Sequence, residues 1–540
     1  IVREKMKNIF YFDSNVTVGR RGPKDELSPW RTEDYLKEME FCGIDAALVL
    51  HASSREYDPL YGNKKVIEEV KKSDRLIPIW SAMPHHCEEF PHPKDFIKMM
   101  NDNNVRAVAL FPKSHQYALN KLVCGDLLTA FSDNDIPLFL SLAKSSQSGQ
   151  QLTLEDVDRV CSDFPDLKVV LWCLRWETAR DIIPMLKKHK NLYFEFSSFQ
   201  ANQAFEYFIS LFGADRFLFG TEYPEKSIGA AKSFVDYSIM TEEDRKKIAG
   251  LNLARLLKLD KLPDPIKQNE NEEPILKLVK EGKPLNDILV IDAHAHMGHN
   301  ESQGVGNVWQ RNSSAKGMVE RNKLIGTDKI LISSWLAIWS DYEEGNEIVY
   351  DAMKQFPDKI IGYASLNPNY VEDWDREIKK VHLEWGFKGM KPYNPRNGVP
   401  YNSPKYQKWY EFGNEHNLFA LMHMSPNFKA EMLEIAAKYQ NITFILAHSG
   451  MSFAVAREHI EIAKERPNVV LEISLTSVTF GVIEYLVKEV GANRVIFGTD
   501  QPMRDPIPQF GWLIYSHLTD EERKKILGEN MQKIIDKCKL

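Results

Sequence analysis

Cysteine is scarce in this chain, and so are the features that mark secreted, membrane-spanning or nucleic-acid-binding proteins. Only six cysteines occur in 540 residues, without paired spacing, so we expect reduced thiols. No apolar run approaches the roughly 20 residues that cross a bilayer, and the opening IVREKMKNIF lacks the apolar core of a signal peptide. No run of Lys or Arg would neutralise a phosphate backbone, and the formal net charge is −7. We therefore expect a cytoplasmic protein with no nucleic-acid or membrane partner.

What the chain does contain is a long internal repeat. GADRFLFGTEYP from Gly213 matches GANRVIFGTDQP from Gly491, and each is followed by a similar helical segment that contains Asn252 or Asn530. These two asparagines are 278 residues apart (530 − 252). Upstream, FDSNVTVG aligns with IDAHAHMG. A chain of this length exceeds what one core usually fills, so we expect two related domains.

Both copies alternate short apolar runs with amphipathic stretches of helical period. Runs that are apolar throughout are typical of strands buried on both faces. The second copy has ILVIDA, KILIS, IIGYAS, KGMK, LFALM, TFILA, VVLEIS and RVIFG, and the first has IFYF, AALVL, LIPIWS, AVALF, PLFLSL, VVLW, LYFEF and RFLFG. Such alternation predicts an α/β fold of two tandem (β/α)₈ TIM-barrel-like domains. We place them at residues 1–260 and 285–540, joined by a polar, proline-containing surface linker at 261–284.

Histidine and aspartate residues follow several predicted strands of the second copy. His294 and His296 come after the first strand, His423 after the fifth, His448 after the sixth and Asp500 after the eighth. Residues i and i+2 of an extended chain point to the same side, so His294 and His296 would both face the barrel mouth. One such histidine is more often a hydrogen-bonded core residue. Five ionisable residues at strand ends indicate a metal site, because imidazole and carboxylate groups bind divalent metals.

The motifs DAHAHMG, MH at strand five, LAHSG and FGTDQP resemble those of the amidohydrolase superfamily, specifically its amidohydrolase-2 branch of metal-dependent TIM-barrel hydrolases. The resemblance implies that His294, His296, His423 and Asp500 bind one divalent metal ion and that His448 is catalytic. Asp500 would also be catalytic, because it can accept a proton from water. Three nitrogens and one oxygen suit zinc first, with manganese and iron(II) as alternatives. A metal ion lowers the pKa of bound water towards 7, so metal-activated water is the expected nucleophile.

Loops after strands two, four and eight hold the candidate substrate-binding residues. Lys391 and Tyr393, in KGMKPYNP, are placed to meet a small anionic substrate, as are Arg396 and Arg504. Structural or solvated roles stay open for all four, and a modified Lys391 that bridges two metals is a further alternative. Trp335 follows strand two and either lines the pocket or packs in the core.

The first copy lacks the metal-binding set. The aligned positions hold Asn15, Thr17, Ser141, Cys173 and Glu222. An amide and two hydroxyls are poor ligands for such an ion, so we expect a degenerate barrel without this catalysis. The tandem chain resembles a dimer made covalent, in which an intramolecular barrel–barrel contact lets the first barrel support the second.

Three functions are compatible with this sequence. The first, which we favour here, is hydrolysis of an ester, lactone or amide of a small substrate by metal-activated water. The second is non-oxidative decarboxylation or hydration, because the same branch contains such enzymes with the same ligands. The third is a non-catalytic scaffold or sensor, which predicts no metal in the purified protein. The substrate does not follow from the sequence, since strand-end loops set it and vary freely on this scaffold.

Overall fold

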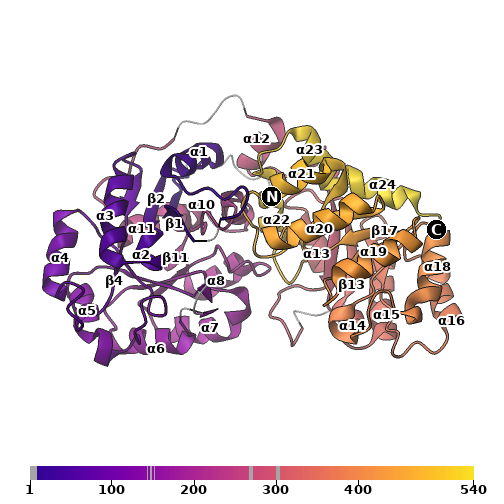
Figure 1. The fold of residues 1–540 in the computed structure, drawn as a ribbon, viewed down its shortest axis with the longest axis horizontal. Helices are drawn as coiled ribbons and strands as arrows, with labels where there is room; N and C mark the ends of the chain where they lie inside the picture. Colours follow the sequence, from indigo (N-terminus) through magenta and orange to yellow (C-terminus); the bar gives the residue numbers. More distant parts are fainter. Residues whose placement is uncertain are drawn as a thin grey trace. The chain divides into compact units, whose positions relative to one another are not determined.

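Parallel strands alternating with helices build two units of the chain, Ile1–Glu272 and Glu273–Leu540 (Figure 1). The structure is a computed structural model that describes residues 9–22, 24–142, 144–145, 149–150, 152–266, 272–299 and 305–540. All six cysteines are free, as the sequence predicts. Within the described residues, no helix combines the length and the apolar character needed to span a membrane.

The second unit is an eight-stranded parallel barrel whose strands pair in chain order. They are β12 (Ile291–Met297), β13 (Lys329–Ser334), β14 (Ile360–Ala364), β15 (Gly389–Met390), β16 (Phe419–Met422), β17 (Thr443–Leu446), β18 (Val469–Ile473) and β19 (Val495–Phe497). The ring closes just beyond β19, where Ala295 bridges Gln501 and the Asp500 amide donates to the His294 carbonyl at 2.7 Å. Each predicted strand overlaps one of these, so the predicted (β/α)₈ barrel is confirmed for this half.

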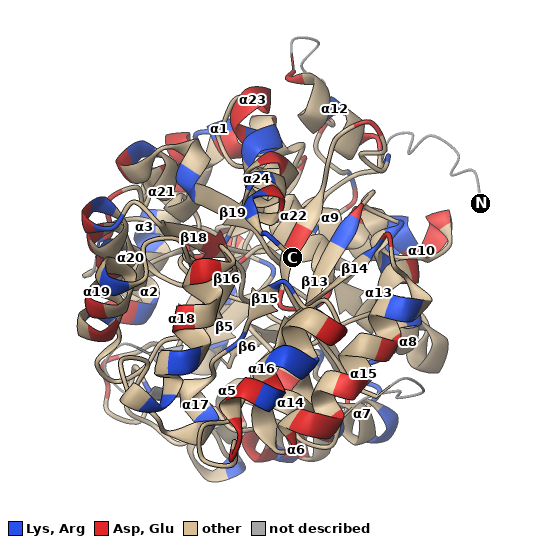
Figure 2. Cartoon of the chain, turned by 90° about the vertical axis from the view of Figure 1, so that its right-hand side faces the viewer, with Lys and Arg blue, Asp and Glu red and all other residues tan. Residues whose placement is uncertain are grey.

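One helix precedes the first strand of the second barrel, and the others follow its strands. They are α12 (Pro274–Lys280), α13 (Ala315–Asn322), α14 (Trp335–Trp339), α15 (Tyr342–Gln355), α16 (Trp374–Ile378), α17 (Asn394–Asn397), α18 (Gln407–Glu415), α19 (Phe428–Lys438), α20 (Phe453–Glu465), α21 (Val482–Val490), α22 (Pro506–Ile514), α23 (Asp520–Lys524) and α24 (Asn530–Lys537). Figure 2 shows basic as well as acidic residues on the outer helices α16 and α18.

Helix α12 differs from the sequence prediction, because it lies inside the expected linker 261–284. Pro274 occupies its first turn, and its side chains Ile275, Leu276 and Val279 are buried. Apolar residues at this helical spacing form a face that packs, so residues from 273 onwards belong to the second unit. The polar composition of the flanking residues hid this short helix in the sequence.

The first unit repeats the architecture with a break in its sheet. Its strands are β1 (Phe12–Val18), β2 (Ala46–His51), β3 (Leu76–Pro78), β4 (Trp80–Ala82), β5 (Val108–Leu110), β6 (Leu138–Ser141), β9 (Val169–Trp172), β10 (Leu192–Glu195) and β11 (Phe217–Leu218), with a small hairpin β7 (Lys144–Ser145) and β8 (Gly149–Gln150). The predicted run LIPIWS is split at Ile79 into β3, which pairs with β2, and β4, which pairs with β5. The predicted run IFYF lies mostly before β1 rather than forming it.

Helices of the first unit occupy corresponding positions in the repeat. They are α1 (Thr32–Cys42), α2 (Ser53–Glu56), α3 (Pro59–Val70), α4 (Pro93–Asp102), α5 (Lys121–Asp133), α6 (Leu154–Asp163), α7 (Ala179–Lys188), α8 (Ala204–Phe212), α9 (Ile228–Tyr237), α10 (Glu242–Lys246) and α11 (Asn252–Leu256). The ring closes as in the second unit, since Val16 of β1 bridges Tyr223 beyond β11. Both halves are thus TIM-barrel units.

A buried aspartate ties the first strand to the last in both barrels. Asp292 accepts hydrogen bonds from the amide of Thr499 at 3.0 Å and from its hydroxyl at 2.5 Å. Asp13 accepts the same pair from Thr221, at 3.0 and 2.5 Å. A buried carboxyl is costly unless it is hydrogen-bonded, so this link holds the strand ends in register.

Candidate metal centre and active site

Three imidazoles and one carboxylate from distant parts of the second unit meet at the carboxyl ends of its strands. His294 and His296 bring their Nε2 atoms to 3.2 Å from each other. Oδ1 of Asp500 lies 3.3 Å from Nε2 of His296 and 3.9 Å from Nε2 of His294. One ring nitrogen of each of His294, His296 and His423 lies within 4.8 Å of the other two. The structure therefore brings together the four side chains that the sequence indicates as ligands.

Strand β12 supplies two of the four, with one difference from the prediction. His294 and His296 lie inside the strand, which runs to Met297, rather than after it. Both imidazoles still reach the same side, because they are two residues apart in a strand. Every residue of this strand is buried. The two imidazoles therefore extend from the barrel wall into its interior.

Hydrogen bonds at the far side of each ring fix how the imidazoles are turned. Nδ1 of His294 lies 3.1 Å from Oε2 of Glu472, and Nδ1 of His296 lies 2.8 Å from the Ser333 hydroxyl. Nε2 of each ring is thereby left to face the cluster. An imidazole held from behind by a carboxylate or hydroxyl is the usual arrangement around a protein-bound metal.

The protonation state of these side chains fits a divalent cation. Burial lowers the pKa of His296 to about 4 and holds the pKa values of His294 and His423 well below the usual range. The rings are therefore neutral at pH 7, which is the form that binds metals. Nε2 of His423 is buried and has no hydrogen-bond partner among the described residues. A buried nitrogen without a partner is costly, and a metal ion would satisfy it.

His448 completes the cluster beside the predicted ligands. Its ring centre lies 4.9 Å from that of His294 and 4.7 Å from that of His423. Its Nδ1 contacts the hydroxyl of Ser474 at 2.7 Å, and that hydroxyl donates to Glu472 at 3.1 Å. Burial lowers the pKa of His448 to about 3. The His448 imidazole is therefore neutral at pH 7 and held in one orientation by Ser474.

Asp500 has two carboxylate oxygens in different surroundings. Oδ1 faces the imidazoles, whereas Oδ2 accepts a hydrogen bond from the guanidinium of Arg504. Arg504 is fixed in turn by a hydrogen bond from its Nε to the hydroxyl of Thr476. Burial alone would raise the pKa of Asp500, but Arg504 and the imidazoles of His294, His296 and His448 together hold the pKa well below its usual range. Asp500 is thus a carboxylate whose Oδ1 faces the imidazoles while its Oδ2 is held by Arg504.

The predicted substrate-binding residues divide into an inner and an outer group. Lys391 is buried, with Nζ 3.4 Å from Nε2 of His294, and burial lowers its pKa to about 7. The Trp335 ring lies on His296, with centres 4.0 Å apart. Tyr393 is partly exposed beside His423, at 4.9 Å between ring centres. Arg396 is exposed, 5.6 Å from the ring of Trp339, and lies outside the inner cluster.

Sequence reasoning missed the residues that support the cluster from behind. Glu472 is fully buried in β18 and contacts both the His294 ring and the backbone amide of His448. Its signal was present, because an acidic residue interrupts the apolar strand seven in both copies, as Glu472 in VVLEIS and Glu195 in LYFEF. Ser333 and Thr476 gave no comparable signal, since serine and threonine are common at strand ends.

The first barrel keeps this framework around different side chains. Glu195 accepts from the amide of Cys173 at 2.8 Å, as Glu472 does from that of His448. Asn15 takes the place of His294 and donates to Glu195 at 3.4 Å. Glu222 forms an ion pair with Lys226 at 2.9 Å. Within the described part of this unit, no three His, Cys, Asp or Glu side chains come together as those of the second barrel do.

Comparison with known proteins identifies the family. The amidohydrolase family profile matches residues 33–259 and 291–536, which is most of the chain and includes both barrels. No curated protein matches the sequence.

Similar solved structures include decarboxylases. A dihydroxybenzoic acid decarboxylase from a Polaromonas species, with bound manganese, is 16% identical with a TM-score of 0.37, over 46% of this chain and 97% of that one. A 5-carboxyvanillate decarboxylase from Sphingomonas paucimobilis is 12% identical with a TM-score of 0.37, over 46% and 99%. A 2,6-dihydroxybenzoate decarboxylase from Rhizobium is 14% identical with a TM-score of 0.36, over 46% and 99%. With the profile matching each barrel in turn, this chain belongs to the amidohydrolase family and is a metal-dependent enzyme of that superfamily.

Proposed function

We propose that the second barrel is a metal-dependent decarboxylase of a small planar acid, either aromatic or unsaturated. His294, His296, His423 and Asp500 would hold one divalent ion, for which three nitrogens and one oxygen suit zinc first. Such an ion supplies a Lewis acid that binds and polarises an oxygen of the substrate. The first barrel, in this proposal, is a degenerate copy without catalysis of this kind.

The Arg504–Asp500 ion pair is the observation that favours decarboxylation over hydrolysis. Hydrolysis needs a base that takes a proton from the attacking water, and the sequence suggests Asp500 for that task. Oδ1 faces the imidazoles and Oδ2 is held by Arg504, so neither oxygen is left for a proton. Decarboxylation needs no base to activate water. The fold does not determine the reaction, because the same fold serves many reactions, whereas the side chains of the site do.

The aromatic and basic side chains beside the imidazole cluster favour a planar, negatively charged substrate. Trp335 and Trp339 stack with ring centres 4.4 Å apart, and Trp335 continues the stack onto His296. Aromatic faces bind planar ligands through offset stacking. Lys391 lies over the Tyr393 ring and Arg396 over the Trp339 ring, and their positive charge suits a carboxylate.

Lys391 is suited to supply the proton. In decarboxylation the bond from the carbon to its carboxylate breaks, CO₂ leaves with the electron pair remaining on the carbon, and a proton replaces the carboxylate there. Burial lowers the pKa of Lys391 to about 7, so its protonated and neutral forms are both populated at neutral pH. Proton transfer is most efficient when the pKa lies near the working pH. His448, neutral and held by Ser474, would orient the substrate by hydrogen bonding.

Two substrate panels test the proposal on the purified full chain. One panel holds hydroxybenzoates and unsaturated mono- and dicarboxylic acids and is assayed for released CO₂. The other holds esters, lactones and amides and is assayed for acid production. We expect turnover in the first panel that is lost in Lys391→Met and retained in Lys388→Met, a nearby lysine outside the cluster. Turnover confined to the second panel would refute the decarboxylase and support hydrolysis.

A further inference from the structure

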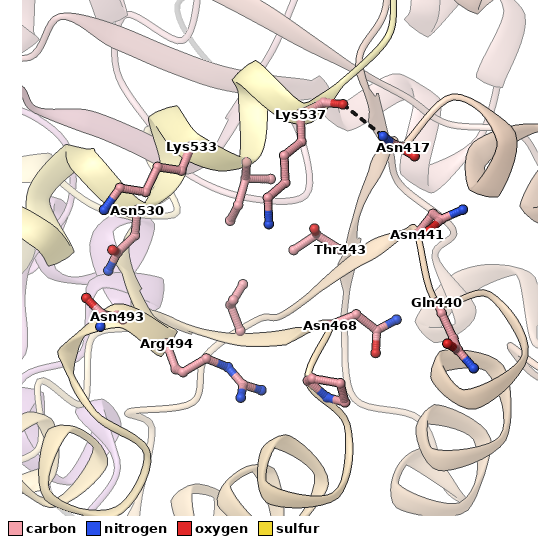
Figure 3. Close-up of a pocket in the computed structure, with 13 residues that line it drawn as sticks. Asn417, Gln440, Asn441, Thr443, Asn468, Asn493, Arg494, Asn530, Lys533 and Lys537 are labelled. Carbon is pink, nitrogen blue, oxygen red and sulfur yellow. Dashed lines mark hydrogen bonds between the residues drawn. The ribbon is translucent and has the colours of Figure 1, made fainter.

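A cavity of about 550 Å³ opens at the amino-terminal end of the second barrel's strands, away from the imidazole cluster (Figure 3). It lies between helix α24 and the segments that lead into β16, β17, β18 and β19. No acidic residue lines it, whereas Arg494, Lys533 and Lys537 do. The Lys537 side chain points into the open space in Figure 3. The cavity therefore has a positive lining that the reaction does not use.

Comparison of the two barrels shows how the charge of this lining differs between them. Asn191 donates to the carbonyls of Phe164 and Leu167, and Asn468 donates to those of Tyr439 and Ile442. These matching bonds fix the alignment of this end of the barrels. With the repeat motifs and strand pairing, the alignment sets three aspartates of the first unit against three cavity-lining asparagines of the second. The pairs are Asp135 with Asn417, Asp166 with Asn441, and Asp215 with Asn493.

Two of these three aspartates of the first unit pair with nearby cations. Asp215 lies 3.2 Å from Nζ of Lys247 and 3.4 Å from Nη1 of Arg255, and Asp135 forms ion pairs with Lys168 and Lys258. In the second unit Lys533 takes the place of Arg255, but Asn493 stands where the first unit has Asp215. The exchange from aspartate to asparagine removes the charge and keeps the size of the side chain.

Two cations of the second cavity are left without a partner. Lys533 and Lys537 are one helical turn apart on α24, and neither forms an ion pair with a described residue. In contrast, Nε and Nη2 of Arg494 are engaged, because they donate to the backbone carbonyls of Ala463, Arg466 and Val469. Arg494 thus adds fixed positive charge, while the two lysines stay available to a ligand.

We propose that this cavity binds a small oxyanion, of the phosphate or carboxylate class, between Lys533, Lys537 and the amide of Asn493. The amide of Asn493 can donate to an anion, which the carboxylate of Asp215 cannot do in the first barrel. The volume exceeds that of a single phosphate group, so the ligand has room for an organic part. The site is separate from the reaction proposed above and does not depend on it.

Titration of the full chain with inorganic phosphate, by calorimetry at low ionic strength, tests this site. Asn417→Asp/Asn493→Asp restores the acids of the first barrel without changing side-chain size, and we expect at least tenfold weaker phosphate binding. Lys533→Gln/Lys537→Gln should lose binding altogether. Lys408→Gln, which removes an exposed lysine paired with Asp375, should bind as the unaltered chain does.

The design separates this cavity from other places where phosphate might bind. Phosphate at the imidazole cluster would not respond to changes at the opposite end of the barrel. Addition of 0.5 M KCl should weaken binding at the cavity, because salt screens partly exposed charges. Phosphate affinity that is unchanged in both double variants, or an absence of phosphate binding by the unaltered chain, would overturn the proposal.

Discussion

Arg504 and Asp500 form a buried ion pair four residues apart, and Lys226 and Glu222 form the corresponding pair in the first barrel. The supporting hydroxyl is also present twice, from Thr476 beside Arg504 and from Ser198 beside Lys226. The pair is thus present in both barrels, although the first barrel has no imidazoles at the aligned positions. It holds the residue after the last strand in a fixed orientation, and only in the second barrel does that residue face three imidazoles.

Arg504→Met should free Oδ2 of Asp500 and loosen the orientation of the carboxylate. Changes to groups that hold a metal ligand typically cost about 10- to 100-fold in metal affinity. We expect a loss of that size, measured by competition with a chelator of known affinity. Lys226→Met removes the matching cation of the first barrel and should leave metal affinity unchanged. Equal losses in the two variants, or none in Arg504→Met, would show that the pair does not position a ligand.

Gly498 allows the closest packing in the cluster. A Cβ atom there would lie 2.2 Å from Oε1 of Glu472 and 2.9 Å from Cβ of His294, both too close for real atoms. Gly498→Ala should therefore displace the His294 ring and reduce bound metal to less than half, with about 1–3 kcal/mol lost from the stability of the second unit.

Gly220→Ala is the matched change in the first barrel, where the added Cβ would lie 2.9 Å from Oγ of Ser14. It should lower stability while the metal content stays constant. Metal analysis alongside thermal unfolding distinguishes the two outcomes. Full metal content in Gly498→Ala would contradict the inferred role of the glycine.

The first unit should become less stable as the pH rises from about 4 to 7. Burial raises the pKa of Asp13 to about 7, whereas an unfolded aspartate titrates near 4. The folded state therefore keeps a proton that the unfolded state has lost. Stability from this group is complete at low pH and falls by about 1.4 kcal/mol per pH unit across that window.

Asp13→Asn mimics the protonated side chain and should not share this decline. The free energy of unfolding, measured with urea at several pH values, should shift in favour of the variant as the pH rises. Asp292 titrates in both proteins, so the difference between them isolates Asp13. A constant difference from pH 4.5 to 7.5 would contradict the raised pKa.

Much of the fold could be predicted from the sequence because its signals are periodic. Apolar strands such as TFIL and VVLEI are each followed by a helix. This alternation recurs along the whole chain and indicates parallel barrels. The internal repeat predicts two barrels. The histidine and aspartate residues at the ends of strands, or within them, predict the metal ligands. The short helix α12 escaped notice because only three buried residues mark it.

The contacts among side chains could not be predicted in the same way. Arg504 was identified as a strand-end residue, but its partner depends on how the loop after β19 turns. The partner of Arg504 matters for the proposed reaction. An arginine bound to Asp500 favours decarboxylation, whereas an arginine bound to the substrate would not distinguish decarboxylation from hydrolysis. The positive cavity also required coordinates, since Asn417, Asn441 and Asn493 are far apart in the sequence and line one space only in the folded barrel.

Metal analysis of the purified full chain tests the central claim most directly. The account predicts about one equivalent of a divalent metal per chain, reduced below a tenth in His296→Asn and in His423→Asn. His86→Asn, an exposed histidine of the first unit, should keep the full amount. A chain that binds no divalent metal, or that holds the same amount in all three variants, would contradict the account.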